Sequence, residues 1–286
     1  MKNSALYHSA HPYFNRRTVL RFNEASGFQS VEDDVATEAP LSVILVYGET
    51  GVRQKTALYV TMRTPGDDFD LARGLLFSEG VIQSAADIVQ IRYAGHTDAL
   101  AIELAPHVPP PPENFQRYFT TNAACGICGK KQVDTEDLVP VVLPRQNGFW
   151  RAKEICAMPA LLAQNQRFFA STGGVHAVGL VFREVGEGPS IVVCEDVGRH
   201  NAMDKLIGAM LRQNALPLHN CAAIFSGRLS YELTQKAAAA GIPALCSIGA
   251  PSSIAIETAE AYGMTVAGFV RATGFNLYCG AWRVRE

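Results

Sequence analysis

Two cysteines, Cys125 and Cys128, form the closest pair of strongly nucleophilic side chains in the sequence. A glycine follows each of them, and Lys130 and Lys131 come next. Nearby ammonium groups lower the pKa of a thiol below its free value of about 8.5, which increases the thiolate that attacks or accepts sulfur. Small glycines leave the sulfur uncovered and let a loop move. The pattern favours a mobile loop that carries sulfur on a cysteine.

Three other interpretations of the cysteine pair remain open. A structural zinc site needs four ligands and would require help from Cys156, Cys194 or His176, which are distant in the sequence. A thioredoxin-like redox pair would begin a helix, yet the flanking glycines are poor helix formers. The pair could also be two small buried hydrophobic side chains. With seven scattered cysteines, a disulfide framework is not expected.

Polar loops follow four apolar segments in the second half of the sequence. Ligands of open α/β sheets bind at the carboxyl ends of strands, where helix N-termini and arginines hold anions. We therefore predict a site for a phosphate-bearing ligand, with Arg199, Ser226, Arg228 and Arg271 among its contacts. The four loops are residues 195–201 (EDVGRHN), 226–228 (SGR), 249–253 (GAPSS) and 271–274 (RATG).

Each of these loops also has a purely structural explanation. Asn201 or Ser252 would cap a helix, and Glu195 or Asp196 would pair with Arg199. Four such loops together are harder to explain in this way. The sequence contains neither GxxxxGK[ST] nor a GxGxxG after a strand, so the common mononucleotide and dinucleotide fingerprints are absent.

The residues around His176 can be compared with the zinc-binding motif of the deaminases. Zinc deaminases use H-x-E followed by P-C-x-x-C, whereas Val178 stands two residues after His176 and the only CxxC lies upstream. The glycine-rich residues 171–176 precede an apolar run, which is typical of a tight turn into a strand. Zinc deaminase chemistry is therefore not expected.

The first of two regions that must position these residues is predicted to be a small sheet with one helix on it. Helical spacing runs from Asp67 until Gly80, and short β-branched or aromatic runs predict the strands. Four consecutive prolines at 109–112 end the region, so we predict an α+β domain at 13–112 and a second domain at 113–286. The strands are expected at 17–22, 41–49, 57–63, 88–93 and 99–104.

The second region alternates compact apolar runs with helical stretches. This pattern predicts an α/β fold with a parallel sheet covered on both faces. A further helix is expected over 154–169, interrupted early by Pro159. The strands are expected at 190–194, 221–225, 243–248 and 264–270, and the connecting helices at 201–213, 229–241 and 252–263.

Composition limits the classes of function. With 286 residues, 48% of them hydrophobic, the chain can bury a sizeable core. A net charge of −2 argues against a protein whose main task is to bind nucleic acid or an anionic membrane. No apolar run approaches the roughly 18 to 20 residues of a membrane span, and the N-terminus does not resemble a signal peptide. We therefore expect a cytoplasmic protein.

Several motifs closely resemble those of the formate dehydrogenase accessory sulfurtransferase family, the FdhD proteins. The CxxC is weak by itself, whereas EDVGRHNA, SGRLS and APSS in this order are highly specific. The matching stretches are 64–67 (TPGD), 74–80 (GLLFSEG), 125–129 (CGICG), 172–177 (TGGVHA), 195–202 (EDVGRHNA) with Asp204 and Lys205, 226–230 (SGRLS), 250–253 (APSS) and 268–271 (GFVR).

This resemblance implies a sulfurtransferase that works through a cysteine persulfide. A cysteine desulfurase would load sulfur on Cys125 of the Cys125/Cys128 pair. The sulfur would then pass to the molybdenum cofactor, Mo-bis(molybdopterin guanine dinucleotide), before formate dehydrogenase receives it. The resemblance also implies a cytidine-deaminase-like second domain, a homodimer, and GDP or another guanine nucleotide as a mimic of the cofactor. The implied cofactor-contacting segment is Phe269, Val270, Arg271, Ala272, Thr273 and Gly274.

The alternative to a sulfurtransferase is a non-catalytic binding protein. It would be a chaperone that shelters the cofactor through its guanine ends, with Cys125 and Cys128 merely structural. A carrier needs a reactive Cys125 and a chaperone does not, so the reactivity of this thiol distinguishes the two.

Overall fold

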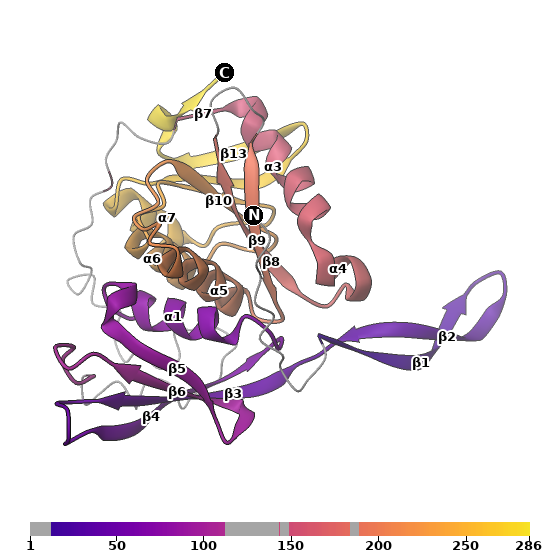
Figure 1. The fold of residues 1–286 in the computed structure, drawn as a ribbon. Helices are drawn as coiled ribbons and strands as arrows, with labels where there is room; N and C mark the ends of the chain where they lie inside the picture. The colour runs from indigo at the N-terminus through magenta and orange to yellow at the C-terminus, as the bar shows by residue number, and fades with distance from the viewer. Residues whose placement is uncertain (1–12, 112–142, 144–148, 184–188) are drawn as a thin grey trace.

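The computed structural model describes residues 13–111, 143, 149–183 and 189–286. Two sheets enclose a layer of helices, with α1 (Asp68–Ser78) on the four-stranded sheet and α5 (Arg199–Arg212) on the six-stranded one (Figure 1). The fold is α/β, as predicted. Cys125 and Cys128, with the lysines that follow them, lie outside the described residues.

The first sheet agrees with the strands predicted after residue 40. Its order is β4-β3-β6-β5, in which β3 and β6 are parallel and the outer strands are antiparallel to them. Leu41, Val43 and Leu45 alternate along β3 and pack with Leu71 and Leu76 of α1 in one buried core. The strands are β3 (Ala39–Tyr47), β4 (Gln54–Arg63), β5 (Ile88–Ala94) and β6 (His96–Leu104), with a 3-10 turn, η1 (Ala85–Asp87), before β5.

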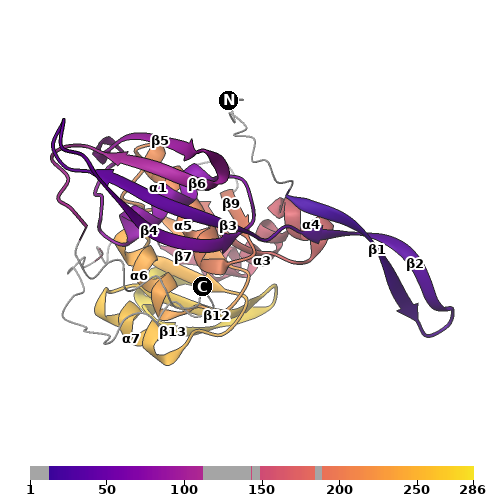
Figure 2. The same ribbon diagram turned by 90° about the horizontal axis from the view of Figure 1, so that it is seen from below.

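The strand predicted at 17–22 does not join this sheet, so its assignment there was wrong. It belongs to β1 (Phe14–Asn23), which pairs with β2 (Gly27–Ala36) in a separate two-stranded ribbon. The ribbon projects from the body of the molecule in both views (Figures 1 and 2). Glu32, Asp33 and Asp34 give β2 an acidic run that conceals its strand character, because charged residues are uncommon in strands.

The second sheet is mixed rather than all parallel, which corrects the expectation from its apolar strands. Its order is β13-β12-β11-β10-β8-β9; β10, β11 and β12 are parallel, whereas β8 is antiparallel to both β10 and β9. Short connections permit only antiparallel pairing, and such connections join β8 to β9 and β12 to β13. The strands are β8 (His176–Phe182), β9 (Ser190–Asp196), β10 (Cys221–Phe225), β11 (Ala244–Ser247), β12 (Thr265–Arg271) and β13 (Gly274–Cys279).

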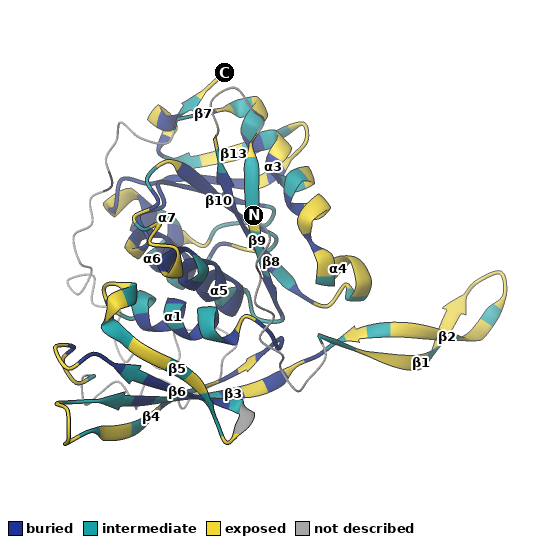
Figure 3. Ribbon diagram, viewed as in Figure 1, coloured by how far each residue is buried: buried dark blue, intermediate teal, exposed yellow. Residues whose placement is uncertain are grey.

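Helices cover both faces of the second sheet, as predicted. Leu206 of α5 and Leu233 of α6 pack on one face with residues of α7, and Met158 of α3 packs on the other. Figure 3 shows the buried residues concentrated between these layers. The remaining elements are α3 (Ala152–Asn165), α4 (Arg167–Thr172), α6 (Tyr231–Ala239), α7 (Ser253–Ala261), η3 (Ala281–Arg283) and a small pairing of β7 (Trp150–Arg151) with β14 (Val284–Arg285).

The helix expected over 154–169 is divided at Gln166, not at Pro159. Pro159 lies inside α3, while Gln166 has extended dihedrals and separates α3 from α4. A proline inside a helix costs a hydrogen bond. Ile155 and Leu162, on either side of it, are buried against the sheet, and this packing holds the helix together through the proline.

Two glycines let α1 and α5 approach closely. A Cβ on Gly74 would overlap the backbone oxygen of Asp204, and a Cβ on Gly208 would overlap that of Asp70. The helices therefore meet backbone to backbone, which couples the two sheets. The predicted boundary between domains 13–112 and 113–286 falls at the edge of residues outside the description and stays a prediction. No helix among the described residues is long and apolar enough to cross a membrane.

Candidate functional site

Three of the predicted loops are joined side by side at one edge of the second sheet. Strands β9 to β12 all run in the same direction, so their carboxyl ends lie at this edge. Backbone N–H groups link these loops to one another and to the adjacent strands: Ser226 donates to Ala177 of β8 (3.0 Å), Gly249 to Gly227 (3.2 Å) and Phe269 of β12 to Gly249 (3.0 Å). We call residues 195–201, 226–228, 249–253 and 269–274 the strand-end site.

Glycines bring these loops close together. A Cβ on Gly249 would lie 3.0 Å from the oxygen of Gly227, and one on Gly268 would lie 2.7 Å from Cδ of Pro251. Both distances are too short for a side chain. The backbone groups of neighbouring loops therefore approach each other directly.

Arg199 begins α5 and carries the strongest sign of a ligand-binding site. Its Nε is buried and has no hydrogen-bond partner among the described residues. A buried, unpaired donor on a cation is costly unless a ligand accepts from it. The charge of Arg199 also acts on His176. Burial lowers the pKa of His176, and the positive charge of Arg199 lowers this pKa further. The ring is therefore neutral at pH 7, and Arg199 is available for an anion.

The other two predicted arginines are exposed at the same edge. Arg228 is exposed and makes no hydrogen bond or ion pair with any residue that the structure describes. In contrast, Nη1 of Arg271 donates to the backbone oxygens of Ile248 and Val270, both at 2.8 Å. Arg271 is thus oriented by its own sheet, whereas Arg228 is free to follow a ligand.

Within the segment 269–274, the side chains point to opposite sides of the sheet. Val270 is fully buried in the core beneath α3, so only its backbone can reach a ligand. Phe269 is 45% exposed and has a φ of 53°, in the left-handed region that a non-glycine residue rarely adopts. Ala272 and Thr273 form the exposed turn that closes at Gly274. The ring of Phe269 is therefore exposed at this segment, and its backbone adopts a strained conformation.

Ser226 is a link between strands. Its Oγ accepts a hydrogen bond from the backbone N–H of Ala177 at 2.9 Å, and its own N–H donates back to the same residue. The hydroxyl proton is not used in these bonds. Ser226 can therefore fix the loop after β10 and still donate to a ligand.

Glu195 does not pair with Arg199. Its carboxylate accepts from the backbone N–H groups of Arg167 (2.7 Å), Phe168 (2.9 Å) and Phe169 (2.9 Å). These are the unpaired donors at the start of α4, so Glu195 is a helix cap supplied by a neighbouring strand.

Asp196 does not pair with Arg199 either. It lies 2.8 Å from Nζ of the buried Lys205, and it accepts from the N–H of Thr64 (3.1 Å) and from Nδ2 of Asn201 (3.0 Å). Both structural pairings expected for Arg199 are therefore wrong. The loop after β9 is instead fastened to the end of β4, and its arginine is left without a carboxylate.

Of the two residues predicted to cap a helix, Ser252 does so and Asn201 does not. Ser252 caps α7, because its hydroxyl accepts from the N–H of Ala255 at 3.3 Å. Asn201 is not a cap: its Nδ2 donates to the oxygen of Met62 at 2.8 Å, and its Oδ1 accepts from Thr61 at 3.2 Å. Asn201 thus connects α5 to β4, a contact that sequence spacing could not reveal.

His200, next to Arg199, was not singled out by the sequence. Its Nε2 lies 3.2 Å from Oγ of Ser230 and 3.6 Å from Oε2 of Glu232. Burial lowers the pKa of His200 to about 4. The ring is neutral at physiological pH and joins the start of α5 to the start of α6. Its position inside the predicted polar loop 195–201 was the signal for it in the sequence.

The described cysteines do not assemble a metal site. Cys156 lies on α3 and Cys194 on β9, where burial raises the pKa of the Cys194 thiol to about 12. The parts of the chain that the structure describes contain no group of three or more histidine, cysteine or carboxylate side chains able to hold a metal ion. The zinc site considered for Cys125 and Cys128 stays untested, because these residues lie outside the description.

Comparison with known proteins agrees with the resemblance seen in the motifs. The model of the FdhD/NarQ family matches residues 36–285. Sulfur carrier protein FdhD of Nocardia farcinica is 42% identical over 280 residues, which cover 95% of each chain. Sulfur carrier protein FdhD of Mycobacterium tuberculosis is 39% identical over 88% of this chain and 92% of its own.

A solved structure shares the fold. The crystal structure assigned to a formate dehydrogenase accessory protein of Desulfotalea psychrophila matches 96% of this chain and 100% of its own, with a TM-score of 0.70 at 22% identity. Since the family model spans residues 36–285 and the relatives match over nearly their whole length, this chain belongs to the FdhD/NarQ family.

Proposed function

We propose that this chain is a cytoplasmic sulfur carrier that serves formate dehydrogenase. It accepts persulfide sulfur on Cys125 from a cysteine desulfurase and transfers it to the molybdenum of Mo-bis(molybdopterin guanine dinucleotide). Relatives named sulfur carrier protein FdhD support the sulfur-transfer role. The expected homodimer stays a prediction.

The observation that carries the cofactor part of the proposal is the buried, unpaired Nε of Arg199 at the strand-end site. A guanine dinucleotide brings phosphates and a planar base. The unpaired Nε of Arg199 and the free guanidinium of Arg228 suit the phosphates. The exposed ring of Phe269 suits the base, because aromatic rings stack on bases with little dependence on base identity.

Loading of sulfur is tested by mass spectrometry after incubation with a cysteine desulfurase and cysteine. We expect wild type and Cys128→Ala to gain one sulfur atom and Cys125→Ala to gain none. Cys128 could attack a persulfide on Cys125 and leave a disulfide with hydrosulfide, so we expect the loop to hold the two sulfurs apart or keep Cys128 protonated. If only Cys128→Ala fails to load, the roles of the two cysteines are reversed although the function stands.

Activation of formate dehydrogenase separates the carrier from a cofactor-binding chaperone. Cys125→Ser should abolish activation and leave the fold intact, because serine cannot hold sulfane sulfur. A variant with normal client activity would refute the carrier role and support the chaperone. The double change of Lys130 and Lys131 to alanine should slow alkylation of Cys125 at neutral pH, since it removes the charges expected to favour the thiolate.

Binding of the nucleotide is tested by calorimetry with GDP. Arg228→Ala should weaken binding by roughly 1.5 to 3 kcal/mol, the usual contribution of a hydrogen bond to a charged group. Arg92→Ala, which removes an exposed arginine from β5 of the first sheet, is the matched control and should bind normally. No heat from GDP, and no competition by the intact cofactor, would count against this site.

A further inference from the structure

His176 lies at the edge of the second sheet that carries the strand-end site, although it begins a strand. Strand β8 is antiparallel to both β9 and β10, so its first residue lies beside their last residues. His176 pairs in register with Asp196, the last residue of β9. The predicted loops all follow strands, whereas the reversed direction of β8 brings a residue that precedes a strand to the same edge.

The side chain of His176 lies on the face of the sheet that α5 covers. Side chains alternate along a strand. Val178 packs in the core beneath α5, whereas Ala177 packs in the core beneath α3. His176 is two residues before Val178 and therefore shares the face of α5, the helix that Arg199 begins.

Both nitrogens of the His176 ring are available to a ligand. Neither makes a hydrogen bond or an ion pair with any residue that the structure describes. Nδ1 lies 3.5 Å from the position that a Cβ would take on Gly227, and glycine has no side chain to cover it. The backbone beside the ring is nevertheless fixed, because Ala177 exchanges two hydrogen bonds with Ser226, at 2.9 and 3.0 Å. His176 is thus positioned but uncommitted.

Groups on β9, α5 and the loop after β10 determine the charge of the His176 ring. Burial opposes protonation most strongly, Arg199 opposes it further, and Asp196 favours it. His200 of α5 is neutral at physiological pH, because its pKa is about 4. Arg228, in the loop after β10, adds a second cation at this edge. Burial and the cations therefore outweigh Asp196 and keep the ring neutral.

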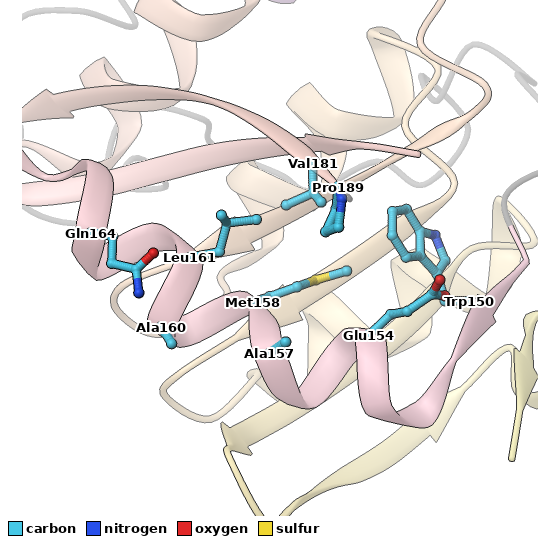
Figure 4. Close-up of a pocket in the computed structure, with 9 residues that line it drawn as sticks. All are labelled: Trp150, Glu154, Ala157, Met158, Ala160, Leu161, Gln164, Val181 and Pro189. Carbon is cyan, nitrogen blue, oxygen red and sulfur yellow. The ribbon is translucent and has the colours of Figure 1, made fainter. Parts of the chain in front are cut away.

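The pocket on the opposite face of the sheet offers a different chemistry. It has a volume of about 250 Å³ and lies beside α3, where Met158 and Leu161 line it (Figure 4). Among the described residues of its lining, Glu154 is charged and none is cationic. An anion is therefore expected at the strand-end edge and not in this pocket.

We propose that His176 takes up a proton when the phosphate-bearing ligand binds, and then donates a hydrogen bond to a phosphate oxygen. The proton comes from solvent, and the neutral imidazole becomes an imidazolium. A phosphate beside Arg199 offsets the positive charge that opposes protonation, and a hydrogen bond between two ionised groups is stronger than a neutral one. This inference rests on the phosphate site of the proposed function and adds a residue and a pH dependence to it.

Proton NMR of the histidine rings tests this uptake directly. The Hε1 signal of His176 is assigned by its loss in His176→Gln, and is followed from about pH 5 to pH 8 with and without GDP. When GDP is bound, we expect the titration midpoint to move to higher pH by about one unit or more. The control is His219, which precedes β10 at the opposite edge of the same sheet and should titrate alike in both states.

Calorimetry shows the same proton in the affinity for GDP. Because binding takes up a proton, the affinity of wild type should rise as the pH decreases between the two midpoints. A phosphate group itself titrates near pH 6, so the comparison is with His176→Gln, which shares that contribution. From pH 8 to pH 6.5, the affinity of wild type should rise about threefold or more relative to this variant. His219→Gln is the matched control and should follow wild type.

Two results would overturn the role of His176 while the phosphate site stands. One is normal GDP binding with an unchanged midpoint for His176. The other is a pH dependence that His176→Gln keeps and His200→Gln loses, which would assign the proton to His200. In contrast, wild type that binds no GDP at any pH would refute the phosphate site, and this inference with it. Unchanged thermal melts would confirm that the variants fold.

Discussion

Residues 195–205 contribute charged side chains to two regions, the buried interface with α1 and β4 and the strand-end site. The charges are paired within the protein in the first region, and Arg199 is unpaired in the second. Against α1 and β4, its charged side chains are buried and paired: Asp196 with Lys205 at 2.8 Å, and Asp204 with Lys236 at 2.9 Å. At the strand-end site, Nε of Arg199 has no described partner. The carboxylates are used within the fold, and the arginine is left for a ligand.

This difference shows how one sequence motif can contain both residues that stabilise the fold and residues that are left to bind a ligand. Burial keeps Asp196 away from solvent and from Arg199, so the loop is fixed without neutralising its cation. A buried ion pair adds little net stability but is costly to break from one side. We therefore expect changes on the buried side to unfold the protein, and changes at the strand-end site to affect ligand binding.

The largest effect is expected from Asp196→Asn. This change leaves Lys205 buried without its counter-charge, which should cost about 3 to 5 kcal/mol of the free energy of unfolding. Urea denaturation measures the loss. Asp34→Asn breaks the exposed pair with Arg16 and should leave the urea midpoint unchanged. Equal sensitivity at the two positions would contradict the contrast.

A smaller loss is expected from Gly208→Ala. The new methyl group would overlap the backbone of Asp70 and force α1 and α5 apart, which should cost about 1 to 3 kcal/mol. Gly274→Ala is the control, because a Cβ there meets no atom within 4 Å. Thermal unfolding measures both. An unchanged melting temperature in Gly208→Ala would mean that the helices separate easily.

His200 should make stability depend on pH. Burial lowers its pKa to about 4 in the folded protein, from 6.5 in the unfolded chain. Between these values the unfolded chain binds more protons, so stability falls as the pH decreases from 6.5 towards 4. The loss from His200 should reach about 2 kcal/mol at pH 5.

Comparison with His200→Gln isolates this contribution. Glutamine does not titrate, so the difference in free energy of unfolding between pH 7 and pH 5 should be smaller in the variant by that amount. Urea denaturation at several pH values gives both slopes. Parallel slopes would show that His200 keeps its ordinary pKa in the fold.

The smallest effect on stability is expected from Phe269→Gly. Glycine adopts the left-handed φ of 53° without strain, and the ring is nearly half exposed. The free energy of unfolding should stay the same or rise by at most about 1 kcal/mol, while affinity for GDP decreases. Calorimetry checks the affinity. A variant that binds GDP normally would exclude the ring from the proposed contact with the base.

Local patterns predicted much of this fold. The alternating residues of β3, the helical spacing of α1 and the apolar runs of β10 to β12 are visible in the sequence, because burial on one face imposes a period. The polar loops after the strands were also predicted, since ligand-binding loops follow the carboxyl ends of strands. The α/β class followed from these elements.

Pairing could not be predicted in the same way. The acidic run of β2 hid the ribbon, and no local signal placed β8 antiparallel between β10 and β9. Nor could spacing reveal that Asp196 bonds Thr64, a residue 132 positions away. Partners at such separation depend on how the elements pack.

The sequence by itself determined most of the elements, the order of the loops and the family, because each depends on residues near one another in the chain. Only the tertiary structure decided which charges are used within the fold and which are left for a ligand. Glu195, Asp196 and Arg199 are close neighbours in sequence, yet the carboxylates bind a helix N-terminus and a buried lysine. The physical reason is that a side chain's partner is set by burial and direction in space, which spacing along the chain does not contain.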